Sequence, residues 1–271
     1  NLASAIFSAA PIPLDVSARR QFSFSRLTGE VRGPRVFAPR GLAADGEPAE
    51  PVVDPLDLGS LVHAVLEDFP WDKAANVESL CRRAAERMFD RPDEYIAPTC
   101  DMIERFAASP RAAELARAKT VYRELEFLLA WRGREADSGQ RTADSQTISA
   151  LGLMPPLAVR CPLSAPRYFQ GFIDCLYQDS GGAWRILDYK TNQATSESLS
   201  EIADQYELQM GVYAMAVEEV LRSPPEELVL YFLRPGLEYR FPWNDDARRR
   251  VVEMVNERVE KLMAASSNHR S

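Results

Sequence analysis

The stretch FQGFIDCLYQDSGGAWRILDYKTN, residues 169–192, constrains the fold of this chain more than any other. Its two arms are aromatic and β-branched and flank the turn sequence DSGG, which predicts a β-hairpin. Because side chains alternate across a strand, Asp188 and Lys190 share one face of the second arm. Asp174 interrupts the apolar first arm in the same way. Charged side chains in otherwise apolar strands indicate a role other than core packing.

The position of the turn decides which residues of the two arms face each other. If the loop holds an odd number of residues centred on Gly181, Asp174 lies opposite Asp188, with Cβ atoms about 5 Å apart. Two carboxylates this close, beside the ammonium of Lys190, are costly to bury unless something binds there. A divalent ion such as Mg²⁺ or Mn²⁺ prefers such oxygen ligands and removes that cost.

An Asp, a spacer and then Asp-x-Lys suit metal-dependent phosphodiester hydrolysis. A metal ion held by Asp174 and Asp188 can polarise a phosphodiester and lower the pKa of a bound water. Lys190 can orient or help to deprotonate that water, and can stabilise the charge that develops on phosphorus. Asp-x-Lys is a common pattern, however. On this motif alone, a solvated strand end with an Asp–Lys ion pair is an equally good interpretation.

The remaining chain predicts an α/β core behind a helical N-terminal portion. Residues 1–55 are rich in Pro and Gly and are expected to form an extended arm or linker, followed by one domain over 56–271. From residue 57 the apolar spacing is that of amphipathic helices, with two or three more after the first. The later elements are expected to be a strand at 120–131, an insert at 132–167, one long helix at 198–223, short strands at 226–236 and 237–243, and a terminal helix capped by Asn244.

Composition excludes several classes of protein. Hydrophobic residues make up 46% and charged residues 27% of the chain, and no apolar run approaches the roughly 20 residues of a membrane span. The net charge of −8 argues against a general phosphate-coating protein but allows a local basic groove, for which Arg160, Arg167 and Arg234 are candidates beside Lys190. The sequence has no GxxxxGK[ST] motif, so this chain alone is not expected to hydrolyse ATP.

The four cysteines predict no metal cluster. No two of them have CxxC spacing, and they are interpreted as reduced thiols of a cytoplasmic protein. They are Cys81, Cys100, Cys161 and Cys175.

Five further residues have an ordinary structural interpretation beside a functional one. His63 flanks the apolar stripe of the first helix, where a lone histidine is more often structural or exposed. Glu124 lies on a strand face that is usually just solvated. Tyr206, Gln209 and Tyr213 recur at helical spacing, which is typical of the rim of a core.

Taken in order, short motifs in this chain resemble the RecB/AddA-type nuclease domain of the PD-(D/E)xK superfamily. That family shows a G-x-x-x-H helix, an R-E-x-x-F strand, a G-x-x-D strand, a D-Y-K-[ST] strand and a Q-x-x-x-Y helix. The matching segments here are GSLVH (59–63), RELEF (123–127), GFID (171–174), DYKT (188–191) and QMGVY (209–213). Each motif is modest, but five in the correct order are specific.

The resemblance implies a restriction-endonuclease-like core, in which helices flank a mixed central sheet. It implies that Lys190 is catalytic, together with Asp174 and Asp188, and that Glu124 lies near the site. Gln209, Tyr213 and Tyr206 are implied to support the site or contact DNA. The implied ligands of a Mg²⁺ or Mn²⁺ ion are His63, Asp174, Asp188 and the backbone carbonyl of Tyr189.

The resemblance also implies a biological setting. Domains of this type usually end a UvrD/Rep-like helicase, so the chain is expected to be an exonuclease that degrades single strands in double-strand-break repair and recombination. A second, AddB/RecC-like subunit is a further expected partner. Relatives with an iron–sulfur cluster use cysteines near the C-terminus, and none follows Cys175, so no cluster is expected. The alternatives are a catalytically inactive DNA-binding or docking module and a stand-alone nuclease.

Overall fold

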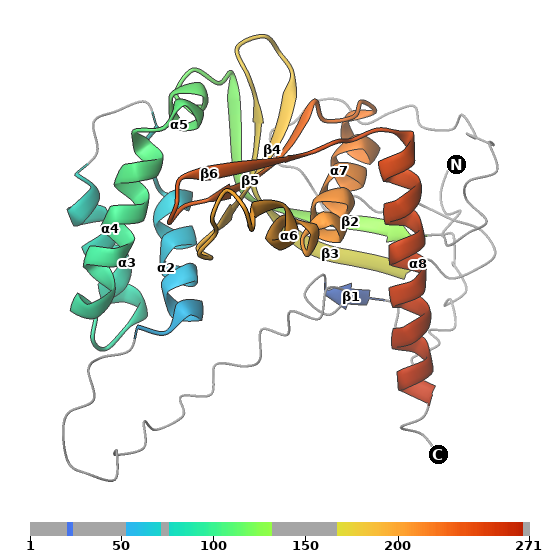
Figure 1. Cartoon of the computed structure of the whole chain (residues 1–271), viewed down its shortest axis with the longest axis horizontal. Helices are drawn as coiled ribbons and strands as arrows, with labels where there is room; N and C mark the ends of the chain where they lie inside the picture. The colour runs from blue at the N-terminus through green and yellow to red at the C-terminus, as the bar shows by residue number, and fades with distance from the viewer. Residues whose placement is uncertain (1–20, 24–52, 72–75, 132–166, 268–271) are drawn as a thin grey trace, which may run out of the picture.

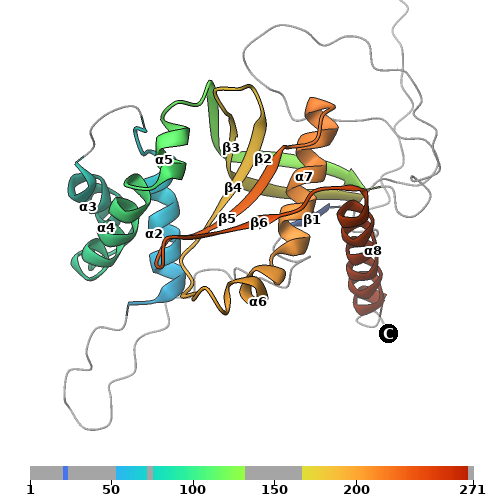
Figure 2. The ribbon, with the colours of Figure 1, turned by 45° about the horizontal axis from the view of Figure 1, so that its top comes forward.

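A computed structural model describes residues 21–23, 53–71, 76–131 and 167–267 of the chain. Their core is a six-stranded mixed sheet with helices on both faces (Figures 1 and 2). This confirms the predicted fold class. Most of the expected insert, Arg160, Cys161 and most of the expected arm lie outside the described residues.

Four helices form the predicted helical portion on one face of the sheet. The first begins where Asp54 accepts a hydrogen bond from the Leu56 backbone N–H at 2.8 Å, with Pro55 in the first turn. Apolar residues of these helices share one core with Tyr177, Leu187 and Val229 of the sheet. The helices are α2 (Pro55–Glu67), α3 (Val77–Met88), α4 (Asp93–Ala107) and α5 (Pro110–Leu115).

The sheet has the order β1-β3-β4-β5-β6, and β2 pairs with β3 outside this path. β1 is parallel to β3 and β4 is parallel to β5, whereas the other pairs are antiparallel. The strands are β1 (Gln21–Ser23), β2 (Thr120–Trp131), β3 (Arg167–Gln178), β4 (Trp184–Lys190), β5 (Glu227–Phe232) and β6 (Leu237–Phe241).

The edge of β3 that faces β4 is divided between two partners. β2 pairs along the whole length of β3, so β1 and β4 must share its other edge. β1 pairs with residues 168–170 and β4 with residues 175–178. Between these two stretches, β3 and β4 diverge and leave a fork at residues 171–174.

The second face of the sheet carries α6 (Leu199–Asp204), α7 (Glu207–Leu221) and α8 (Asp245–Ser267). The prediction of one long helix over 198–223 is wrong, because the chain turns at Gln205 and Tyr206 between α6 and α7. The turn places the ring of Tyr206 4.5 Å from the Lys190 ammonium, a cation–π contact that a continuous helix is not required to make.

The ends of the chain bear on two further predictions. The side chain of Asn244 accepts from the Ala247 N–H at 2.9 Å, which confirms it as the N-cap of α8. The part of residues 1–55 before α2 that the structure describes includes β1, an extended strand added to this sheet. Within the described chain, no helix combines the length and apolarity needed to cross a membrane.

Candidate metal and catalytic site

The hairpin has the register that brings its two aspartates together. Gln178 pairs with Trp184 and Cys175 with Leu187, so the loop between the strands is centred on Gly181 as expected. Continued by one residue, this register sets Asp174 opposite Asp188, at the mouth of the fork. There the strands part, and Asp174 Oδ2 accepts a hydrogen bond from the Tyr189 backbone N–H at 2.8 Å.

Helix α2 contributes His63 to the fork. A Cβ atom at Gly59 would lie 3.4 Å from Thr191 Oγ1, so a glycine lets the helix approach the end of β4 closely. His63 lies one helical turn further on and faces the same strands. Its Nδ1 atom is 3.5 Å from Asp174 Oδ2 and 3.6 Å from Glu124 Oε1.

Glu124 reaches the site through an irregularity in β2. Its φ angle is +44°, which is uncommon for a residue with a side chain and costs on the order of 1–3 kcal/mol. The ladder with β3 passes from the pair Arg123–Cys175 to the pair Leu125–Ile173, and neither Glu124 nor Asp174 belongs to a pair. Both acids therefore lie where the regular sheet is interrupted.

These side chains fit a divalent ion. One ligand atom from each of His63, Glu124 and Asp174 lies within 4.8 Å of the others. Two carboxylates and an imidazole are suitable ligands for a hard or borderline ion such as Mg²⁺ or Mn²⁺. Asp188 is not part of this trio, but its buried Oδ2 atom has no hydrogen-bond partner among the described residues. An unsatisfied buried carboxylate oxygen favours a nearby positive charge.

Lys190 supplies one such charge from the adjacent position on β4. Its Nζ atom is 2.7 Å from Asp188 Oδ2, an ion pair whose geometry is not that of a hydrogen bond. The ammonium donates instead to Gln209 Oε1 at 3.2 Å. Lys190 is therefore held between an acid, an amide and the ring of Tyr206.

Gln209 and Tyr213 project from α7 toward the same acid. The amide of Gln209 donates to Asp188 Oδ1 at 3.3 Å and to the Tyr213 hydroxyl at 2.7 Å. Gln209 is buried, so these bonds replace water that it has lost. One glutamine thus fixes the acid and the lysine relative to each other.

The titration behaviour reflects the crowding of acids. Burial lowers the pKa of His63, but Asp174, the hydrogen bond from Glu124 and Asp188 outweigh it and raise the pKa to about 9. Burial and the charge of Asp174 raise the pKa of Asp188 to about 6. Burial opposes the charge of Lys190, yet Asp188 and Asp174 raise its pKa above the usual value. Each shift is what an excess of negative charge in a poorly solvated site produces.

The structure thus brings the predicted side chains together in two adjoining groups. His63, Glu124 and Asp174 form one, and Asp188 and Lys190 with the α7 residues form the other. Tyr189 points its ring the other way, 5.2 Å from the ring of Phe106, so only its backbone faces the fork. Sequence reasoning missed Asn192, whose side chain accepts from the Tyr206 hydroxyl at 3.4 Å, because no motif marks it.

Comparison with known families agrees with this site. Residues 21–270 match the model of the PD-(D/E)XK nuclease superfamily. The chain belongs to this superfamily, as its five ordered motifs and the forked sheet predicted.

Its relatives are components of ATP-dependent helicase/nuclease enzymes. It is 33% identical over 208 residues to an ATP-dependent helicase/nuclease protein of Pelotomaculum thermopropionicum, a match that covers 74% of this chain and 14% of the relative. A protein of the same name from Oceanobacillus iheyensis is 24% identical over 71% of the chain and 14% of the relative. The chain therefore spans about a seventh of these relatives. A solved structure of a putative exonuclease from Eubacterium rectale covers 79% of the chain and 68% of that structure, with a TM-score of 0.44 and 9% identity.

Proposed function

We propose that this chain is a metal-dependent deoxyribonuclease, which hydrolyses phosphodiester bonds of DNA at the fork between β3 and β4. The observation that carries the proposal is the convergence there of His63, Glu124 and Asp174 beside an ion-paired Lys190. Each of these residue types serves phosphodiester hydrolysis, and they come from separate elements of the fold. Asp188 and the carbonyl of Tyr189 remain proposed ligands as well.

The chain's own residues have distinct parts in this reaction. A bound Mg²⁺ or Mn²⁺ ion supplies Lewis-acid polarisation of the phosphodiester and a water of lowered pKa. Lys190 stabilises negative charge on the phosphoryl oxygens and orients the attacking water. Gln209 holds Lys190 in place, because its amide binds both the ammonium and Asp188. Tyr206 supports the same ammonium with the face of its ring.

We further propose the setting in which the nuclease works. The names of its relatives support a helicase in the same parent protein, with single-stranded DNA as the substrate delivered to the fork and double-strand-break repair as the process. A second subunit of the AddB/RecC type belongs to this proposal too. Arg234 is a suitable phosphate contact near the site, because its Nε donates to the Thr191 carbonyl at 2.6 Å, next to Lys190.

The proposal is tested by comparing the wild-type chain with Lys190→Ala on single-stranded DNA. With Mg²⁺ or Mn²⁺ the wild type should release cleaved products, and Lys190→Ala should lose at least about 100-fold in rate, as expected when a group that stabilises transition-state charge is removed. Chelation by EDTA should stop the wild type. The matched control is Lys119→Ala, an exposed lysine at the far end of the hairpin, which should cleave normally. Equal rates for the wild type and Lys190→Ala, or no cleavage by either, would contradict the proposal.

A further inference from the structure

An exposed phenyl ring lies on the strand that carries Asp174. Phe172 is 49% exposed, whereas Phe169 and Ile173 on the same strand are almost completely buried. An apolar ring left in water forgoes the stabilisation that burial would give it. A large exposed aromatic side chain beside a candidate active site is therefore a candidate for ligand contact.

Strand geometry places this ring close to the proposed cleavage site. Phe172 precedes Asp174 by two residues, a separation of about 7 Å along a strand. It also lies in the unpaired stretch 171–174, where neither β1 nor β4 covers that edge of β3. A nucleotide next to the bound phosphodiester is thus within reach of the ring.

The opposite face of this part of the sheet is occupied. Phe127 and Ile173 belong to the core formed with α7, and Phe127 lies 5.6 Å from the ring of Tyr213 on that helix. Glu126, which pairs with Phe172, is exposed like it. Phe172 and Glu126 therefore project to the side away from α7 (Figure 1).

We propose that Phe172 is a stacking platform for a base of single-stranded DNA adjacent to the scissile phosphodiester. The inference rests on the proposed nuclease function and adds a residue that selects the form of the substrate. Bases stack on exposed aromatic rings without regard to their identity, and only a single strand presents an unpaired base face. Duplex DNA keeps its bases stacked on each other and offers the ring no partner.

The charges around Phe172 favour a base over a phosphate at this position. Glu126 lies opposite, and its carboxylate accepts a hydrogen bond from the side chain of Gln170. Asp174 lies on the other side. A neutral base is compatible with these acids, whereas an additional phosphate beside them would be repelled.

Tyr122 provides a matched control. It is 45% exposed, but its ring is stacked at 6.2 Å on Trp184 and it pairs with Leu176 further along the hairpin. It has the same exposure and aromatic character as Phe172 and already has a ring partner, away from the fork.

The test measures binding by fluorescence anisotropy with a labelled oligothymidylate and with the same oligonucleotide carrying abasic positions. All proteins also carry Lys190→Ala, so that the DNA stays intact. Phe172→Ala and Phe172→Leu should each bind oligothymidylate about 5- to 150-fold more weakly, the range seen when one stacking ring is removed. Phe172→Trp and Tyr122→Ala should bind like the parent. The abasic oligonucleotide should bind the parent and Phe172→Ala alike.

The outcomes separate this inference from the proposed function. Unchanged binding by Phe172→Ala, with wild-type cleavage intact, would overturn the stacking role and leave the nuclease standing. Equal losses for oligothymidylate and the abasic strand would also overturn it, because they indicate a contact other than stacking. Tighter binding by Phe172→Ala would mean that the ring obstructs DNA. Urea unfolding of each variant verifies the fold, and Phe172→Leu keeps the test decisive if Phe172→Ala unfolds.

Discussion

Gln209 shows at the scale of one residue how the candidate site is held together. Its single amide contacts Asp188, Lys190 and the Tyr213 hydroxyl, and all of these contacts are buried or partly buried. A side chain that orients a catalytic lysine and an acid is expected to affect activity more than its own burial affects stability.

The first prediction at this scale concerns Gln209→Ala. Removing the amide frees Lys190 and Asp188 to pair in other geometries, so cleavage should slow by about 10- to 100-fold, as is usual for residues that orient a metal site. The readout is the rate of single-strand cleavage at saturating Mg²⁺, alongside the urea midpoint.

Gln205→Ala is the matched control, because Gln205 is exposed one helical turn earlier at the end of α6. It should leave the rate unchanged. A normal rate in Gln209→Ala would show that Lys190 does not need this amide.

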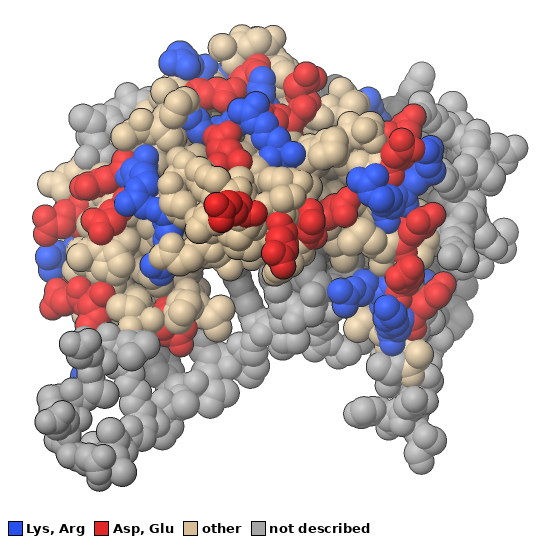
Figure 3. Space-filling view, viewed as in Figure 1, with Lys and Arg blue, Asp and Glu red and all other residues tan. Residues whose placement is uncertain are grey.

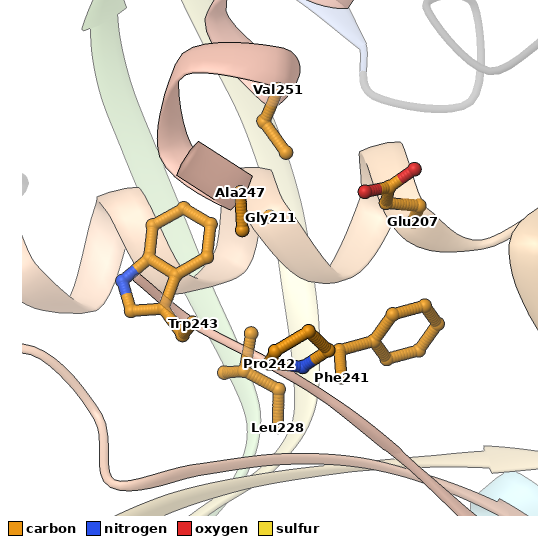
Figure 4. Close-up of a pocket in the computed structure, with 8 residues that line it drawn as sticks. All are labelled: Glu207, Gly211, Leu228, Phe241, Pro242, Trp243, Ala247 and Val251. Atoms are coloured by element: carbon orange, nitrogen blue, oxygen red, sulfur yellow. The ribbon is translucent and has the colours of Figure 1, made fainter. Parts of the chain in front are cut away.

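At the scale of elements, α7 and α8 pack unusually closely at Gly211. A Cβ atom there would lie 2.7 Å from Val251 Cγ1 and 3.0 Å from Val251 Cβ, closer than real side chains approach each other. Figure 4 shows the two residues beside a small hollow of about 10 Å³ lined also by Leu228 and Trp243. Glycine at this position therefore determines how near α8 lies to the helix that carries Gln209.

Gly211→Ala should therefore destabilise the chain. Overpacking of this kind costs about 1–3 kcal/mol, which outweighs the better helix propensity of alanine. Urea unfolding at neutral pH measures the change in free energy of unfolding.

A double-mutant cycle provides the control for Gly211→Ala. Val251→Ala removes the two methyl groups in the way, so the double variant should be more stable than the sum of the single changes predicts. Strict additivity would mean that the two positions do not press on each other.

At the scale of the whole molecule, one buried guanidinium joins the helical portion to the sheet. Arg111 of α5 is 4% exposed and donates to Glu227 of β5 and to both carboxylate oxygens of Glu238 of β6. Tyr177 of β3 accepts from it as well, at 2.8 Å. Surface views show Lys and Arg alternating with Asp and Glu over the visible face, so much of the charge is locally compensated (Figure 3).

This network predicts a loss of stability in acid. Burial raises the pKa of Glu227, but Arg111 and Arg185 outweigh it and lower the pKa below its usual 4.5. The pKa of Glu238 is lowered in the same way, mainly by Arg111 against the effect of burial. A lowered pKa contributes stability that is present above about 4.5 and disappears as the pH falls through the folded-state value. The free energy of unfolding should therefore decrease from pH 6 to pH 3.

Arg111→Met tests the origin of that loss. It should cost about 3 kcal/mol at pH 6, because it leaves two partly buried carboxylates without their main partner, and it should flatten the dependence on pH. Arg240→Met, which removes an exposed arginine from the same network, should cost little. An equally steep pH dependence in Arg111→Met would assign acid sensitivity to other carboxylates.

The hairpin could be predicted from sequence because its signals are local. The turn residues and the alternation of 169–192 decide the register, and β3 and β4 form with the expected loop. The long helix over 198–223 was predicted incorrectly because nothing local marks Tyr206 as a break. Its turn brings the ring to Lys190, a residue on a distant strand.

Residue order and periodicity alone were sufficient for the class of fold, the hairpin register, the cap of α8 and the assignment to a nuclease family. These follow from interactions between near neighbours or from ordered motifs. Only the tertiary structure decided that Glu124 joins His63 and Asp174, and that Phe172 stays exposed while the residues around it are buried. The physical reason is that the fork between β3 and β4 arises from pairing with β1 and β2, segments far apart in the chain, and no local preference encodes where strands will diverge.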